Sequence, residues 1–210
     1  MKPGSTPRPG HRAWLALTLL LGLCASAVEP AWAAEVPRAL RAWLHATDTS
    51  PTADQLRRTS PDVEAALAAV AADSTEHRFA RLRAVALLSR LGTGSADERL
   101  RAIAKSADAR LRATALMALG AGLGRRLPKA ALPALSVGLR HADRETRLAA
   151  ARALGLVADP AAAGKLAQRA LATERDEAIR QALTTLVLRA RPAGAQPKPS
   201  AATGKPQNRK

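Results

Sequence analysis

Apolar residues recur every three or four positions along most of the chain from residue 60 to residue 190. This is the spacing of an amphipathic helix. Polar residues and prolines interrupt the pattern at regular intervals, which predicts two alternating sets of short helices. The first set is 61–72, 96–105, 128–140 and 161–172, and the second is 79–92, 108–120, 143–155 and 176–188.

The helices of the second set share a sequence pattern. In three of them an Asp stands four residues before an Arg, and two of them contain R-x-x-A-x-x-A-L-G, at residues 112–120 and 147–155. The aligned arginines are spaced by 29, 35 and 33 residues, and they are Arg83, Arg112, Arg147 and Arg180. The chain therefore contains about four copies of a unit made of two helices.

Each position of this unit has a local structural role. The Asp accepts hydrogen bonds from free N–H groups of the first turn, and the small Ala residues let neighbouring helices approach closely. Gly92, Gly120 and Gly155 are expected to adopt the left-handed conformation that ends a helix. Ser60-Pro61 and Asp159-Pro160 are start signals, in which an N-cap residue precedes a Pro of the first turn.

Composition supports a helical fold for the whole chain. Of 210 residues, 51 are Ala and 31 are Leu, while there are 3 Trp, 1 Phe and no Tyr. Ala and Leu favour helix, and the residues that strands prefer are scarce. We therefore predict an all-α protein and exclude a β-sandwich, a barrel or a large parallel sheet.

The two-helix unit, with its Asp and Arg at the start of the second helix, resembles the HEAT repeat in its short bacterial form, the lyase-type HEAT-like repeat. This resemblance implies a right-handed α-α superhelix, a HEAT-like solenoid of about four helical hairpins. It also implies a ladder of contacts between Asp and Arg side chains of successive repeats, to which Arg83 is poorly matched because Phe79 replaces the Asp. The ladder residues are Asp108, Arg112, Asp143, Arg147, Asp176 and Arg180.

The same resemblance implies that the second helix of each repeat lines the concave side of the array. Positions one and five residues after each ladder Arg then point away from the partner helix. They form a mixed, mildly apolar candidate binding ridge, which suits a protein or peptide better than a phosphate backbone. The alternative is that the array merely exposes these residues. They are Ala113, Met117, Leu148, Arg152, Gln181 and Thr185.

The segments that flank the repeats differ in character. Residues 34–59 contain two short predicted helices, 37–47 and 51–58, which we expect to cover the first repeat, with Trp43 buried there. The repeat domain follows at 60–190. Residues 191–210 follow the repeat domain as a tail. Counted from Arg189, the end of the chain has four Pro, six Lys and Arg, and no acid. This composition predicts a disordered basic tail.

The N-terminus has the features of a secretory signal peptide, predicted at residues 1–33. A basic start is followed by an apolar run at 13–28 and by small-x-small sites, which allow cleavage after Ala33 or after Ala27. The alternative is an uncleaved anchor, although the run is shorter than the roughly 20 residues that span a bilayer. We therefore expect an exported protein of the periplasm or extracellular space.

Cys24 is the only cysteine, so the chain has no internal disulfide. Its place at the end of the apolar run suggests a lipoprotein as an alternative. The residue before it is Leu23, where bacterial lipid-attachment sites have a small residue. We therefore favour the interpretation that Cys24 is one of the small hydrophobic residues of the signal peptide.

Candidate chemistry is sparse. There is no Walker loop, no Gly-x-Gly-x-x-Gly and no Gly-x-Ser-x-Gly elbow. The glycine-rich stretch 120–124 follows a predicted helix, so we expect a flexible loop between helices. The four His are far apart in sequence, and we predict no metal site, no cofactor and no catalysis.

Charge leaves a second class of function open. The chain carries +16, and residues 34–188 hold 24 Lys and Arg against 16 Asp and Glu. Such basicity attracts nucleic acid or other anionic polymers, and a family of DNA alkylation-repair enzymes also uses HEAT-like repeats. The export signal and the scarcity of aromatic residues for base stacking argue against nucleic acid. We therefore expect a scaffold of the cell envelope that binds an unknown protein partner, with an anionic-polymer binder as the alternative.

Overall fold

The computed structural model describes residues 36–46 and 49–191. The chain divides into two units, Met1–Ala34 and Glu35–Lys210, and every described residue belongs to the second. The predicted signal peptide with Cys24, and the predicted tail from residue 192 onward, lie outside the described residues.

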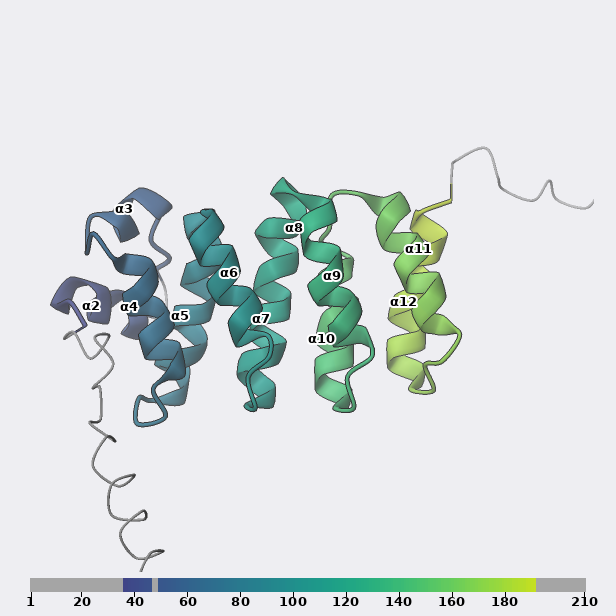
Figure 1. Ribbon diagram of the computed structural model, residues 1–210, viewed down its shortest axis with the longest axis horizontal. Helices are drawn as coiled ribbons and strands as arrows, with labels where there is room; N and C mark the ends of the chain where they lie inside the picture. The colour runs from purple at the N-terminus through teal and green to yellow at the C-terminus, as the bar shows by residue number, and fades with distance from the viewer. Residues whose placement is uncertain (1–35, 47–48, 192–210) are drawn as a thin grey trace, which may run out of the picture. The chain divides into compact units, whose positions relative to one another are not determined.

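The described residues form helices joined by short turns, and no strand occurs among them (Figure 1). This confirms the all-α prediction. The helices are α2 (Arg38–His45), α3 (Ala53–Arg57), α4 (Val63–Ala72), α5 (Arg78–Leu91), α6 (Gly94–Ile103), α7 (Ala109–Ala121), α8 (Leu123–Arg126), α9 (Pro128–Leu139), α10 (Arg144–Leu154), α11 (Pro160–Leu171) and α12 (Glu177–Arg189).

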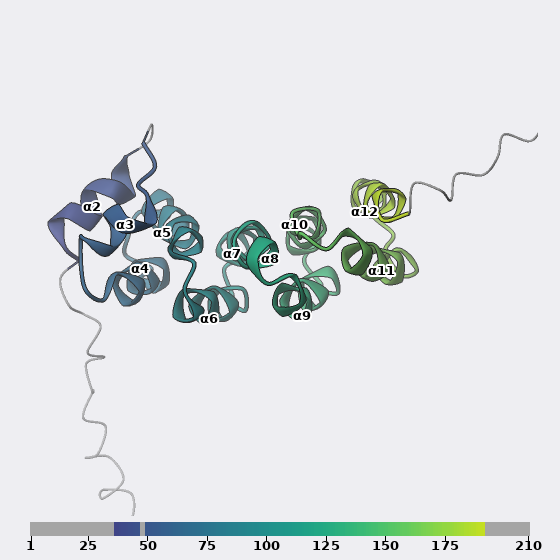
Figure 2. The same cartoon turned by 90° about the horizontal axis from the view of Figure 1, so that it is seen from above.

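The helices after α3, apart from the single turn of α8, lie in two rows (Figure 2). The A layer consists of α4, α6, α9 and α11, and the B layer of α5, α7, α10 and α12. Each A helix is followed in the chain by its B partner, so four helical hairpins stack side by side. This arrangement confirms the HEAT-like solenoid that the sequence pattern predicts.

The core consists of two apolar clusters that meet at α7. Leu111, Ala115 and Leu119 of this helix belong to the N-terminal cluster, whereas Leu116 belongs to the C-terminal one. Because α7 lies in the middle of the stack, it buries residues against the preceding repeat and against the following one. The array therefore has a continuous interior without a large central core.

The helices α2 and α3 cover the N-terminal end of this interior. Leu40, Leu44 and Leu56 are fully or almost fully buried there, whereas Trp43, which we expected as the anchor, is only half-buried. Leu has the advantage that it buries no polar group, while the indole N–H of Trp needs a partner. A polar contact also attaches the segment before α3 to α5, since Arg83 of α5 donates to the carbonyl oxygen of Thr49 at 2.5 Å.

The helix starts follow the local sequence signals at most positions. The side chains of Asp108, Asp143, Asp159 and Asp176 all accept hydrogen bonds from backbone N–H groups of the first turn. The exception is α4, which begins two residues after Pro61. There the Ser60 hydroxyl accepts from the N–H of Asp62 at 3.2 Å, so a turn precedes the helix.

The glycine prediction is right at one position and wrong at two. Gly92 has the left-handed φ of 68°. Gly155 is right-handed, and Gly120 lies inside α7, so neither ends its helix in the way we expected. Gly120 serves close packing instead: a Cβ atom there would lie 2.4 Å from the carbonyl oxygen of Ala153 on α10.

The stretch 120–124, which we expected to be a flexible loop, is ordered. Arg126 of α8 bonds both carboxylate oxygens of the buried Asp97 at 2.9 Å, which attaches α8 to α6. The carbonyl oxygen of Gly124 accepts from the N–H of Ala158 at 3.0 Å, which attaches α8 to the turn after α10. These contacts between repeats were not visible in the local sequence.

We predict that Gly120→Ala destabilises the protein, although Gly→Ala inside a helix ordinarily stabilises by up to about 1 kcal/mol. The new methyl group would overlap the backbone of Ala153, which cannot move without shifting α10. Overpacking of this kind costs about 1–3 kcal/mol, measured as the free energy of unfolding in urea. The control is Gly94→Ala, where the added atom meets open space. Stabilisation by both substitutions would contradict the close approach of α7 and α10.

Candidate protein-interaction surface and the ladder behind it

Arg112 on α7 is the most buried member of the predicted ladder, with a relative exposure of 8%. Its Nε donates to the hydroxyl of the buried Thr146 at 2.8 Å, and its guanidinium lies 3.4 Å from Asp143. It also donates to the carbonyl oxygen of Ser106 at 2.7 Å, in the turn of its own repeat. One side chain thus closes its own turn and reaches the N-cap of the next repeat.

Arg81, and not Arg83, has this position in the first repeat. It stands four residues after the N-cap His77, donates to the carbonyl oxygen of Ala71 at 3.1 Å and lies 3.5 Å from Asp108. The sequence alignment of this repeat was therefore wrong by two residues. The cause is that His77 caps α5 through its imidazole Nδ1, so no Asp marks the helix start.

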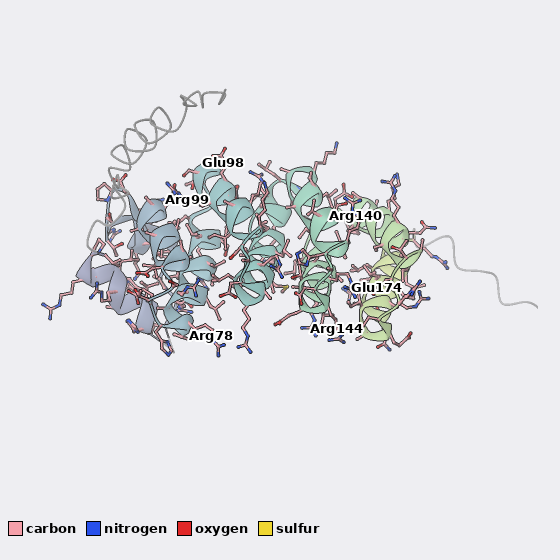
Figure 3. All side chains as sticks on the ribbon, turned by 60° about the horizontal axis from the view of Figure 1, so that its bottom comes forward. Arg78, Glu98, Arg99, Arg140, Arg144 and Glu174 are labelled. Atoms are coloured by element: carbon pink, nitrogen blue, oxygen red, sulfur yellow. The ribbon has the colours of Figure 1, made fainter. Side chains whose placement is uncertain are left out.

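The last two repeats use different acids from those expected. Arg147 bonds the nearly buried Glu174 at 2.9 Å, and Arg144 bonds Asp176 at 2.5 Å. Figure 3 labels Arg144 and Glu174, which come from the adjacent repeats that these pairs connect. Arg180 reaches the carbonyl oxygen of Glu174 at 3.0 Å, in the turn of its own repeat. The one described acid with which it forms an ion pair is the exposed Glu177 at 3.9 Å.

These contacts keep the ladder carboxylates ionised. The Thr146 hydroxyl and N–H, assisted by Arg112, lower the pKa of Asp143 to about 2. Burial by itself would raise the pKa of Glu174, but the Arg147 guanidinium and the backbone N–H groups of the next two residues outweigh it, so this pKa is also lowered. The hydrogen bond from Arg144 lowers the pKa of Asp176. These three carboxylates are therefore ionised at neutral pH.

The exposed side of α7 and α10 forms a groove of about 500 Å³, which we call the B-layer groove. Four of the six predicted ridge residues line it, so the structure brings these four together. Met117 and Leu148 supply large apolar side chains, while Arg144, Glu145 and Arg152 supply charge. The lining residues are Ala113, Thr114, Met117, Arg144, Glu145, Leu148, Ala149 and Arg152.

The other two ridge residues, Gln181 and Thr185, lie on α12 and are exposed. They do not line the B-layer groove. The Thr185 hydroxyl donates to the carbonyl oxygen of Gln181 at 3.0 Å, so it is partly engaged by its own helix. The ridge is therefore divided into a grooved part on α7 and α10 and a separate polar part on α12.

Neither a metal site nor a membrane-spanning helix occurs among the described residues. Among residues 36–46 and 49–191, no group of three or more His, Cys, Asp and Glu is placed to hold a metal ion. Within the same residues, no helix is long and apolar enough to cross a membrane. The acids of the ladder are held by arginines of neighbouring repeats, which leaves them in a structural role.

Comparison with protein families agrees with this geometry. Residues 98–187 match the family model of HEAT repeats. This segment consists of HEAT repeats. The matched segment extends from α6 to α12 and includes the ladder arginines from Arg112 onward and the whole B-layer groove. The chain matches none of the curated proteins with which it was compared.

The structure identifies three HEAT-repeat ladder residues that the sequence pattern missed, namely Arg81, Arg144 and Glu174. Arg81 could have been found by counting four residues from His77 as a possible cap. Arg144 and Glu174 had no such signal, because Asp143 and Asp176, one and two residues away, already fitted the pattern. Their pairing depends on the rotation between the last two HEAT repeats, which local sequence does not specify.

We predict that Arg147→Ala lowers the free energy of unfolding by about 2–4 kcal/mol, because it leaves the nearly buried Glu174 carboxylate without its partner. Adding Glu174→Gln should recover part of this loss. Arg110→Ala, at an exposed position of α7, is the control and should cost less than about 0.5 kcal/mol. Equal effects of Arg147→Ala and Arg110→Ala in urea unfolding would contradict a structural role for the ladder.

Asp143 should make stability depend on pH at the acid end. Its pKa is about 2 in the folded protein and about 3.9 when unfolded. A lowered folded pKa adds stability that is complete above the unfolded value and is lost as pH falls through the folded value. The stability difference between the wild type and Asp143→Asn should therefore shrink between about pH 4 and pH 2. Urea midpoints across this range test it, and a constant difference would refute it.

Proposed function

We propose that this protein is an exported, non-catalytic scaffold that binds a protein partner through the B-layer groove. HEAT repeats generally mediate protein–protein interaction, and their family is typically a non-catalytic scaffold. The observation that carries the proposal is the grouping of Met117, Leu148 and Arg152 in one groove on α7 and α10.

The composition of the groove suits a protein partner. Protein interfaces combine an apolar centre with a polar rim, and they are enriched in Met and Arg. Here Met117 and Leu148 line the same groove as the charged Arg144, Glu145 and Arg152. The flexible thioether of Met117 can adapt to different partner side chains. Arg152 forms no ion pair with a described carboxylate, so its guanidinium is available to one on the partner.

Export is supported by the sequence of the first 33 residues. The basic start, the apolar run and the small-x-small sites favour secretion, with the mature chain beginning at Ala34 or at Val28. The protein would then act in the periplasm or extracellular space, or at a membrane if Cys24 carried lipid. The intact mass of the native protein distinguishes these forms.

An anionic-polymer binder is the second candidate, favoured by the net charge of +16. The described surface supports it less well, because Arg81, Arg112, Arg144 and Arg147 are engaged by acids. The B-layer groove also contains Glu145, which would repel a phosphate backbone. Deleting residues 192–210 should therefore leave partner binding nearly intact, whereas a polymer binder would lose affinity and salt dependence together.

We predict that Met117→Glu/Leu148→Glu abolishes recovery of the partner that co-purifies with the wild type from the envelope fraction. The matched control is Leu127→Glu/Leu188→Glu, which places the same charges at two exposed leucines outside the groove. Quantitative mass spectrometry of the three samples gives the measurement. A partner that is retained by both double variants would overturn the assignment of the groove.

A further inference from the structure

The A layer contains two further grooves, which occupy equivalent places in successive HEAT repeats. The first, of about 410 Å³, lies between α4 and α6, and the second, of about 250 Å³, lies between α6 and α9. The ladder residues Arg81 and Arg112 form corresponding parts of their walls. Both grooves are distinct from the B-layer groove, since they share no lining residue with it.

The two A-layer grooves correspond residue by residue. Ala102, Ser106 and Leu111 line the first, and the residues 35 positions later, Val137, His141 and Thr146, line the second. The correspondence follows from the repeat itself, because the ends of the A helices and the starts of the B helices lie at the same level in each hairpin. A ligand that fits one groove could therefore continue into the other across α6.

The apolar part of each groove is large and open. Ala71, Ala72 and Ile103 supply it in the first groove, and Pro133, Ala134 and Val137 in the second. Val137 is 61% exposed, which makes it the most exposed large hydrophobic residue described. These surfaces lie in grooves between helices, which suits the side chains of an extended chain better than a flat lipid surface.

The charged residues that line the A-layer grooves are all basic, although Arg81 and Arg112 among them are paired with Asp108 and Asp143. Arg99 lines the first groove, and Arg101 and Lys105 line the second, while no described lining residue of either is acidic. None of these three forms an ion pair with a described carboxylate. The Nε of Arg99 is buried without a hydrogen-bond acceptor in the described residues. Figure 3 shows Arg99 on α6, beside Glu98.

We propose that the two A-layer grooves together bind an extended acidic segment of a partner protein. Its apolar side chains enter successive grooves, and its carboxylates face Arg99, Arg101 and Lys105. Packed helices lie about 8–10 Å apart, and an extended chain advances about 3.3 Å per residue. The apolar anchors of the segment are therefore about three residues apart. The chain's own residues 189–210 contain no acid, so they do not have the composition of such a segment.

The test uses a fluorescein-labelled peptide, Leu-Glu-Glu-Leu-Glu-Glu-Leu, and the full chain at physiological ionic strength. Fluorescence anisotropy should show that it binds at least about tenfold more tightly than Ser-Glu-Glu-Ser-Glu-Glu-Ser, which has the same charge without the apolar anchors. Arg101→Glu/Lys105→Glu should lower the affinity for the first peptide by at least about tenfold. Val137→Asp is a second variant at an exposed position and should act in the same direction.

The matched control is Lys165→Glu/Arg169→Glu, which makes the same change in net charge at two exposed residues of α11. It should change the affinity by less than about threefold, since these residues lie outside both grooves. Equal affinity for the two peptides, or equal losses in the groove variant and the control, would overturn the proposal in favour of attraction by net charge alone.

Two further measurements separate this inference from the other possibilities. If the wild type binds phosphatidylglycerol vesicles but not the leucine peptide, and the groove variant loses the vesicles, the grooves face a lipid surface and the inference fails. If Met117→Glu/Leu148→Glu abolishes peptide binding, the peptide occupies the B-layer groove. In that case the inference fails while the proposed function stands.

Discussion

The structure depends on a carboxylate that serves two helices at once. Asp143 accepts from the backbone N–H of Thr146, which starts α10, and it also receives the guanidinium of Arg112 from the preceding repeat. The Thr146 hydroxyl connects the two interactions, since it accepts from Arg112 and donates to Asp143. The start of one HEAT repeat and its attachment to the previous one are therefore the same interaction, which fixes the register between α7 and α10.

This register determines where the exposed side chains lie. Because the Arg112 side chain is held toward the turns, Ala113 and Met117 of α7 lie on a different side of the helix, beside Leu148 and Arg152 of α10. Close packing supports the same register, since Gly120 brings the backbones of α7 and α10 together at their C-terminal ends. The B-layer groove thus depends on the ladder contacts and on the close packing at Gly120, which together fix α7 against α10.

Much of this could be predicted from the sequence because the decisive signals are local. Apolar spacing and the N-cap Asp residues predicted every repeat helix within two residues. The position one residue after the ladder Arg112, taken from the family resemblance, correctly placed Ala113 on the grooved side. What could not be predicted depends on contacts between repeats. Gly120 has the sequence context of a helix end but is held inside α7 by Ala153, and Arg126 orders α8 only because Asp97 lies opposite it.

In the first repeat and at the A-layer grooves, too, the repeat pattern was not sufficient to predict the contacts. The cap of α5 is an imidazole, so a search for Asp misplaced the ladder Arg by two residues. The cations around the A-layer grooves come from residues that the repeat pattern does not fix, such as Arg99 and Lys105. Their shared location appears only when successive A helices are placed side by side.

The exposed Arg180 has a consequence for how the array unfolds. In a chain of nearest-neighbour units, opening an internal repeat breaks two interfaces, whereas opening a terminal repeat breaks one. At the N-terminal end, α2 and α3 supply an additional interface with the buried Leu40, Leu44 and Leu56. Arg180 belongs to the last described repeat and reaches no acid of a further one. Among the described helices, the α11–α12 hairpin therefore has the fewest interfaces to break when it opens, and slow hydrogen exchange is concentrated around α7 in the middle of the array.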